Sequence, residues 1–74
     1  MTYANYEHHD DATIERMALD LRGRGIREVA VIRGVTRGNV WTNKTYHLFT
    51  RLGWWKTGEE LTKDGDEYIV MKTR

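Results

Sequence analysis

The chain of 74 residues contains no cysteine, no serine and no proline. The absence of cysteine excludes disulfides and thiolate metal ligands and fits an intracellular protein. Without serine or cysteine the commonest covalent nucleophiles are missing, and the carboxylates show no recognisable catalytic pairing, so we expect neither an enzyme nor a cofactor. His8 and His9 are adjacent but lack a third well-placed ligand, and no metal site is expected.

Long apolar runs are missing as well. No stretch approaches the roughly 20 apolar residues of a membrane span, and the N-terminus has neither the basic start nor the apolar run of a signal peptide. We therefore expect no membrane partner and a cytoplasmic location. A chain this short buries only about 60% of the surface that its unfolded form exposes. This favours a single domain with a thin margin of stability, to which a ligand or a second copy contributes.

A net charge of +1 hides a strong segregation of charge along the sequence. Residues 1–20 carry one basic side chain against five acidic ones, residues 21–56 carry eight against one, and residues 57–74 carry three against five. The formal charges of these segments are −4, +7 and −2. A clustered basic stretch is typical of nucleic-acid-binding proteins, although a solvated helical surface shows the same pattern.

The N-terminal third predicts an arm followed by a helix. Residues 1–9 have no periodicity and are interpreted as an N-terminal arm. Asp10 and Asp11 are good helix-capping residues, and apolar residues follow them at i, i+3, i+4 and i+7. Gly23 and Gly25 are expected to end this first helix.

Two more helices are predicted in the basic middle. Residues 26–33 are expected to form a short helix. Gly34 is expected to end it, because glycine readily adopts the left-handed conformation of a sharp reversal. Thr36 is a suitable N-cap for a third helix from about Arg37 to Leu52. One side of this helix is apolar, and the other carries a row of hydrogen-bonding groups.

After Gly53 the period changes. Aromatic and β-branched residues flank a polar centre with an Asp-Gly turn, which predicts a β-hairpin with strands near 54–57 and 67–72. Because neighbouring residues of a strand point to opposite faces, only one of Trp54 and Trp55 is expected in the core. The pair fits either a lid over the core or a platform for single-stranded bases.

Ala30, Gly34 and Val40 have the spacing that lets two helices cross closely: a small residue, a glycine at the turn and an apolar residue that closes the gap. With "EVAVIRGVTRGNV", the stretch 26–45 resembles the helix-turn-helix of bacterial and phage transcription regulators. "LFTRLGWW" and the hairpin after it resemble the end of the recognition helix and the wing of winged helix proteins.

The resemblance covers about residues 11–72. It implies an α+β fold in which a three-helix helix-turn-helix core is followed by a C-terminal β-hairpin wing, a winged helix over residues 10–74. The implied function is a small sequence-specific double-stranded DNA-binding protein, a homodimeric transcriptional regulator of a phage or other mobile element.

In such a protein the recognition helix, here about 36–52, enters the major groove. The residues that the resemblance places on base edges are Arg37, Asn39, Thr42, Asn43 and Tyr46. Those expected on phosphates are Arg24, Arg27, Thr36, Gly38, Lys44, His47, Arg51 and Lys56, with Arg22 as a further candidate.

Two features depart from the winged helix pattern. Arg33 stands where an apolar residue is usual, and the presumed wing tip, "TGEELTKDGDE", is acidic, so phosphates would repel it. An alternative function is therefore an adaptor or inhibitor that binds a protein, such as polymerase or a host defence complex, through residues 54–67. RNA binding by the basic middle is a third reading, with no module signature behind it.

Overall fold

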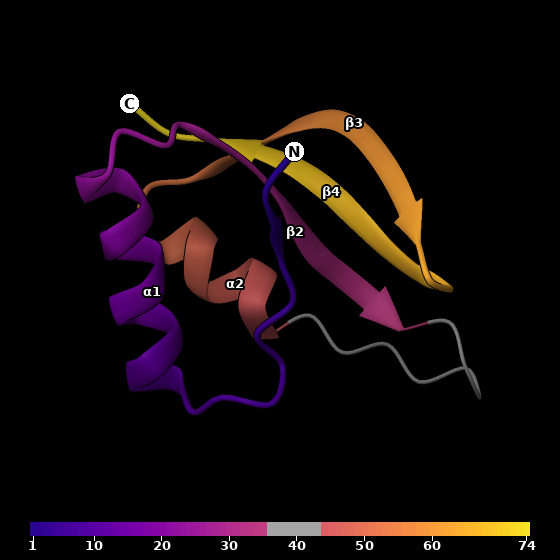
Figure 1. Ribbon diagram of the computed structural model, residues 1–74, viewed down its shortest axis with the longest axis horizontal. Helices are drawn as coiled ribbons and strands as arrows, with labels where there is room; N and C mark the ends of the chain where they lie inside the picture. Colours follow the sequence, from indigo (N-terminus) through magenta and orange to yellow (C-terminus); the bar gives the residue numbers. More distant parts are fainter. Residues whose placement is uncertain (36–43) are drawn as a thin grey trace.

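The computed structural model of the protein describes residues 1–35 and 44–74. The elements in these ranges are β1 (Tyr3–Ala4), α1 (Asp11–Gly23), β2 (Glu28–Val35), α2 (Lys44–Arg51), β3 (Trp55–Lys63) and β4 (Asp66–Lys72). The strands form one sheet, and both helices pack against the same face of it (Figure 1).

The sheet has the strand order β1-β2-β4-β3. β1 pairs in parallel with β2, placing Tyr3 opposite Ala30, and the backbone N–H of Ala30 donates to the carbonyl of Thr2 at 2.8 Å. α1 makes the crossover that a parallel pair requires. β2 and β4 are antiparallel, as are β4 and β3, so β2 and β4 are the two interior strands.

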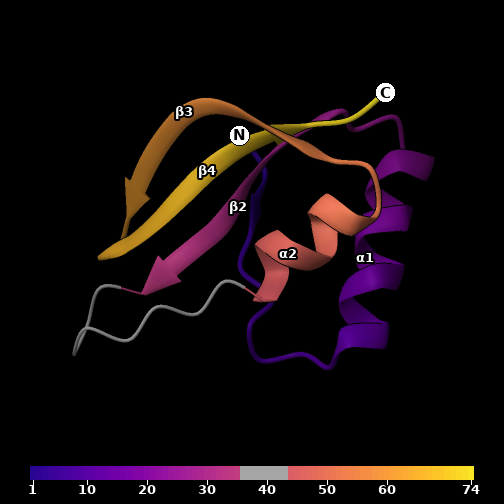
Figure 2. The same ribbon diagram turned by 180° about the vertical axis from the view of Figure 1, so that it is seen from behind.

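The main core lies between the helices and the sheet (Figure 2). Its buried members are Ala4, Ile14, Ala18, Leu21, Val29, Val31, Leu48, Phe49, Trp54, Ile69 and Met71. α1 supplies the predicted stripe, and its first turn is capped by Asp10, whose side chain accepts from the N–H of Thr13 at 2.9 Å. The first predicted helix is therefore present, starting at the predicted cap.

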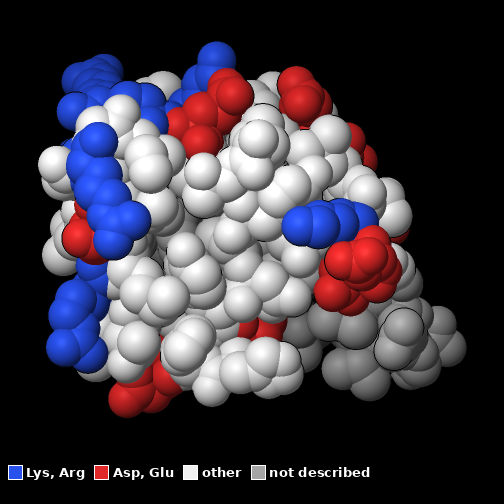
Figure 3. Space-filling model, viewed as in Figure 1, with Lys and Arg blue, Asp and Glu red and all other residues white. Residues whose placement is uncertain are grey.

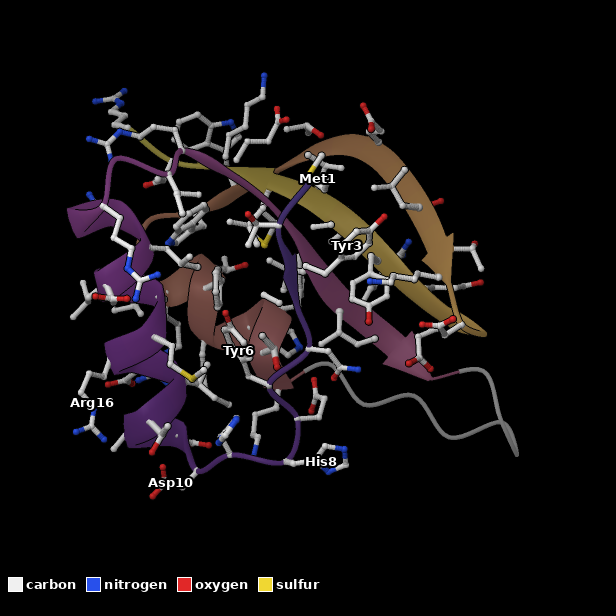
Figure 4. The ribbon with its side chains drawn as sticks, viewed as in Figure 1. Met1, Tyr3, Tyr6, His8, Asp10 and Arg16 are labelled. Atoms are coloured by element: carbon white, nitrogen blue, oxygen red, sulfur yellow. The ribbon has the colours of Figure 1, made fainter. Side chains whose placement is uncertain are left out.

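The other face of the sheet carries a smaller cluster. Ala30, Ile32 and Tyr68 are buried there, and Tyr3 and Leu61 pack against them. Tyr3 lies over the sheet in Figure 4, and its ring meets that of Tyr68 edge-on at 5.0 Å. β2 is thus buried on both faces over residues 29–32, and β4 over residues 68–71.

The predicted helix over 26–33 is wrong, because residues 28–33 belong to the interior strand β2. Its backbone continues past the expected reversal, with Gly34 opposite Glu67 and Val35 opposite Asp66 in the pairing with β4. An uninterrupted apolar run is typical of a strand buried on both faces, and over this length its period does not distinguish strand from helix. The β-branched residues of "VAVI" favour the strand.

The predicted recognition helix over 36–52 is described only in part. Within the described residues α2 spans only Lys44–Arg51, and residues 36–43 lie outside them. Thr45, Leu48 and Phe49 form its buried side.

The C-terminal hairpin is present, but it is not a wing. β3 and β4 turn at Asp64-Gly65, as predicted, and β4 then pairs with β2 in the central sheet. The predicted bounds of the first strand, near 54–57, are wrong, because β3 continues to Lys63. The predicted three-helix core with an appended wing is therefore wrong. The described residues form an α+β fold of two helices and a four-stranded mixed sheet.

Candidate nucleic-acid interface

Several elements end close together at one end of the sheet. α1 stops at Gly23, β2 starts at Glu28 and β4 stops at Lys72. The backbone N–H of Thr73 donates to the carbonyl of Arg27 at 3.0 Å. The chain's last residues therefore lie beside the connection between α1 and β2, where the C-terminus is marked in Figure 1.

Basic side chains gather at this end. We define the basic end as Arg22, Arg24, Arg27, Lys72 and Arg74. Lys and Arg atoms line the flank formed by α1 as far as the C-terminus (Figure 3), and Arg16 projects outward from α1 on the same flank (Figure 4). Two acidic residues, Asp20 and Glu28, pair with members of the basic end, which leaves a formal side-chain charge of +3.

The ion pairs at the basic end are exposed. Arg24 Nη2 lies 2.8 Å from Asp20 Oδ2, and Lys72 Nζ lies 3.4 Å from Glu28 Oε2. Exposed pairs of this kind contribute about 0–1 kcal/mol to stability. A phosphate can therefore replace either carboxylate at little cost.

Arg22 has a structural part in this arrangement. Its Nη1 donates to the carbonyl of Leu52 at 3.1 Å in a partly buried position, which ties the end of α1 to the residue after α2. Arg27 Nη1 donates in turn to the carbonyl of Arg22 at 2.9 Å. Both contacts put a cation where helix dipoles are negative, and Arg27 keeps further N–H donors for a ligand.

An exposed tryptophan stands beside these cations. Trp55 is 46% exposed and lies directly opposite Lys72 in the pairing of β3 with β4. Trp54 is only 1% exposed and packs against Phe49, so one indole of the pair is in the core, as predicted. Because Met71 belongs to the main core, the pleat places Lys72 and Trp55 on the face away from the helices.

The far end of the same two strands is acidic. We define the acidic hairpin as Glu59, Glu60, Asp64, Asp66 and Glu67. Lys63 lies 4.3 Å from the centroid of the Tyr3 ring, and Arg33 pairs with Glu60. In Figure 3, acidic atoms are present on the side opposite the basic flank.

Most of the residues predicted to read bases lie outside the described residues. These are Arg37, Asn39, Thr42 and Asn43, together with the predicted phosphate contacts Thr36 and Gly38. Tyr46 is described, and it is half-buried against the main core rather than displayed on an open helix face. Of the predicted base-reading residues, the described ranges thus include Tyr46 alone.

The other predicted phosphate contacts divide between two places. Arg24 and Arg27 belong to the basic end, and Arg51 borders it, because the carbonyl of the next residue accepts from Arg22. Lys44 begins α2 at the opposite end, where its Nζ donates to the carbonyl of His9 at 2.6 Å.

His47 and Lys56 are exposed, on α2 and β3 respectively. Within residues 1–35 and 44–74, the side chains of Arg51, Lys56 and Arg74 have no hydrogen-bond or ion-pair partner, so their charges are available.

Lys72 and Arg74 belong to the basic end but were not among the residues predicted to contact nucleic acid. The signal in the sequence is the pair of basic residues in "MKTR", at the end of the last predicted strand. Its significance depends on the sheet, which brings this end of the chain next to Arg27. Trp55 is recognisable in the sequence as one of two adjacent tryptophans. That Lys72 lies next to it follows only from the pairing of β3 with β4.

The described residues hold no group of three or more metal-binding side chains, and none of their helices is long and apolar enough to cross a membrane. No family model matches the chain, and no curated protein or solved structure is significantly similar to it. What the protein binds must therefore be inferred from the chemistry of its surface.

Proposed function

We propose that the protein binds single-stranded nucleic acid at its basic end. Phosphates are held by Arg24, Arg27 and Arg74, and one base stacks on Trp55. The observation that carries the proposal is the exposed indole of Trp55 directly across from Lys72. A cationic groove beside an aromatic platform is the usual means of holding a single strand, because every base has a stacking face.

The exposed indole favours a single strand over a duplex. A base can stack on a protein side chain only when it has left the helical stack, as the bases of single strands do. Major-groove reading instead needs an exposed recognition helix, and α2 buries Thr45, Leu48 and Phe49 on one side while His47, Thr50 and Arg51 are exposed. Sequence-specific gene control by residues 36–52 stays a prediction, because most of the residues expected to read bases lie outside the described ranges.

The proposed contacts set the size of the effects to measure. For single strands, the logarithm of the binding constant falls with the logarithm of salt concentration, with a slope of about −0.7 for each phosphate neutralised. Three phosphates therefore give a slope of about −2. Stacking adds about 1–3 kcal/mol for each base.

The test is a fluorescence-anisotropy titration of a labelled, unstructured single-stranded DNA at several salt concentrations, repeated with the matching duplex. We expect tighter binding of the single strand, and a salt slope that becomes shallower by about 0.7 in Arg27→Gln and in Arg74→Gln. Lys63→Gln is the matched control, because it removes one positive charge at the acidic hairpin. The proposal fails if the folded protein binds no strand or if Lys63→Gln weakens binding as much as the two arginine variants do.

A second candidate is a protein partner at the acidic hairpin. It is favoured by the exposure of Glu59 and Asp64 at the end of the molecule far from the basic end. A pull-down from nuclease-treated lysate separates the two candidates. A directly bound protein is retained by Arg27→Gln and lost when Glu59 and Asp64 are changed to Gln and Asn, whereas partners bridged by nucleic acid disappear with the nuclease.

A further inference from the structure

A hollow of about 430 Å³ lies between α2 and β3, on the helix side of the sheet. It is lined by Arg33, Tyr46, Lys56, Gly58, Glu60 and Ile69. Lys56 is paired with Met71 and Glu60 with Ile69, and both partners belong to the main core, so these two side chains of β3 rise on the same side as α2. Pockets that hold small ligands have volumes of about 300–1,000 Å³.

An irregularity in β3 helps to form this hollow. The pairing with β4 is interrupted between Lys56 and Glu60, and Gly58 there has a φ of +94° with no atom within 4 Å of the position of a Cβ. Thr57 Oγ1 donates to the carbonyl of Val70 at 3.0 Å and so replaces part of the interrupted ladder. The bulge lets β3 arch at this point (Figure 1), which leaves room beside α2.

The side chains of the hollow suit an anion that carries a flat polar ring. Arg33 pairs with Glu60 across it, which offsets both charges, whereas Lys56 has no partner among the described residues. The net charge of the lining is therefore +1. Tyr46 offers a ring for stacking, and Glu60 retains acceptor sites beyond those that Arg33 occupies.

We infer that the hollow is a second subsite, which takes the nucleotide adjacent to the one stacked on Trp55. The inference rests on the proposed function. Trp55 and Lys56 are consecutive in β3 and point to opposite sides of the sheet, so a strand that crosses this edge reaches both. β3 is the outer strand of the sheet, which leaves its edge accessible to such a crossing. The phosphate lies on Lys56 and the base lies against Tyr46.

Glu60 gives this subsite a base preference. A carboxylate accepts hydrogen bonds and donates none, so it favours bases with an exocyclic amino group, such as cytosine, over uracil, whose corresponding atom is a carbonyl oxygen. We expect oligo(dC) to bind roughly tenfold more tightly than oligo(dU) of the same length. A difference of this size is what one additional hydrogen bond to a charged group contributes.

The experiment measures the affinity of oligo(dC) and oligo(dU) for the wild-type protein and for single variants. Glu60→Ala is expected to bring the dC/dU ratio close to one, and Lys56→Gln to weaken both strands several-fold while the ratio persists. Tyr46→Leu is expected to weaken both strands. Glu59→Ala, which removes a neighbouring carboxylate outside the lining, is the matched control and keeps the ratio.

Thermal unfolding shows whether each variant is folded. If Tyr46→Leu does not fold, the variants of the exposed residues Lys56 and Glu60 still test the subsite through the dC/dU ratio. A dC/dU ratio near one in the wild type, or one that Glu60→Ala leaves unchanged, overturns the subsite. If Arg27→Gln and Trp55→Ala still weaken binding in that case, the proposed function stands without it. Absence of binding to either strand overturns both.

Discussion

Trp55 and Lys72 lie directly opposite each other at the start of β3 and the end of β4, and Lys72 in turn lies opposite Glu28 at the start of β2. This row joins three segments that are far apart in the sequence. It places an exposed indole opposite a cation that pairs with an exposed carboxylate. The proposed binding of single strands depends on this relationship.

The two adjacent tryptophans are expected to behave in opposite ways. Trp55→Ala removes a half-exposed side chain, so the free energy of unfolding should change by no more than about 0.5 kcal/mol, whereas binding of a single strand should weaken by about 1–3 kcal/mol. Trp54→Ala empties a position in the main core and should cost about 3–5 kcal/mol of stability. Urea unfolding and strand titration of the two variants check this. Equal losses of stability would contradict the assignment of the two indoles.

The cap of α1 predicts a dependence of stability on pH. A hydrogen bond with the Thr13 side chain and one from its backbone N–H lower the pKa of Asp10 below its ordinary value of 3.8. A carboxyl group with a lowered pKa in the folded state stabilises the fold above its unfolded pKa, and this contribution is lost as the pH falls from about 4 through the folded value. Asp10→Asn keeps a capping acceptor and should match the wild type at neutral pH.

Thermal unfolding between neutral pH and pH 3 provides the measurement. We expect the Tm of Asp10→Asn to fall less than that of the wild type below pH 4, and Asp10→Ala to have a lower Tm already at neutral pH. Parallel Tm profiles for the wild type and Asp10→Asn would show that this carboxylate does not stabilise the helix.

Gly58 tests the bulge in β3. Its φ of +94° is unfavourable for any residue with a Cβ, although no atom lies within 4 Å of that position, so the cost of Gly58→Ala comes from the backbone. We expect a loss of about 1–2 kcal/mol in the free energy of unfolding. Gly23→Ala is the matched control, because Gly23 ends α1 with equal space around it and the change should be neutral or stabilising. A neutral Gly58→Ala would mean that β3 is regular there.

Local signals in the sequence were sufficient for α1 and for the turn of the hairpin. Asp10 caps the helix, its apolar residues recur at helical spacing, and Asp64-Gly65 reverses the chain. These features depend on neighbours in the sequence and were predicted with nearly the right bounds. β1 gave no such signal, because two residues suffice for a strand when a parallel neighbour is already present.

The segment 28–35 was misread because its environment, and not its own period, decides its structure. Ala30 and Gly34 have the spacing of a helix-turn-helix, but residues 29–32 are buried in an interior strand, where both faces need small or apolar side chains. Once this segment is a strand, the hairpin after α2 completes the sheet and is no longer an appended wing.

The candidate site was only half visible in the sequence. Arg24 and Arg27 stand in the basic middle that the charge pattern marked, whereas Lys72 and Arg74 belong to a segment with a net negative charge. Pairing between β2 and β4 brings the two groups together, and no local pattern reports that pairing.

The most direct test of the central claim is a ¹⁵N–¹H NMR titration of the wild-type protein with a short single-stranded DNA. We expect the largest amide shift changes at residues 22–28, 54–56 and 72–74, with broadening of the indole N–H signal of Trp55 and little change at residues 62–67. Shift changes confined to the acidic hairpin, or none at all at low salt, would contradict binding at the basic end.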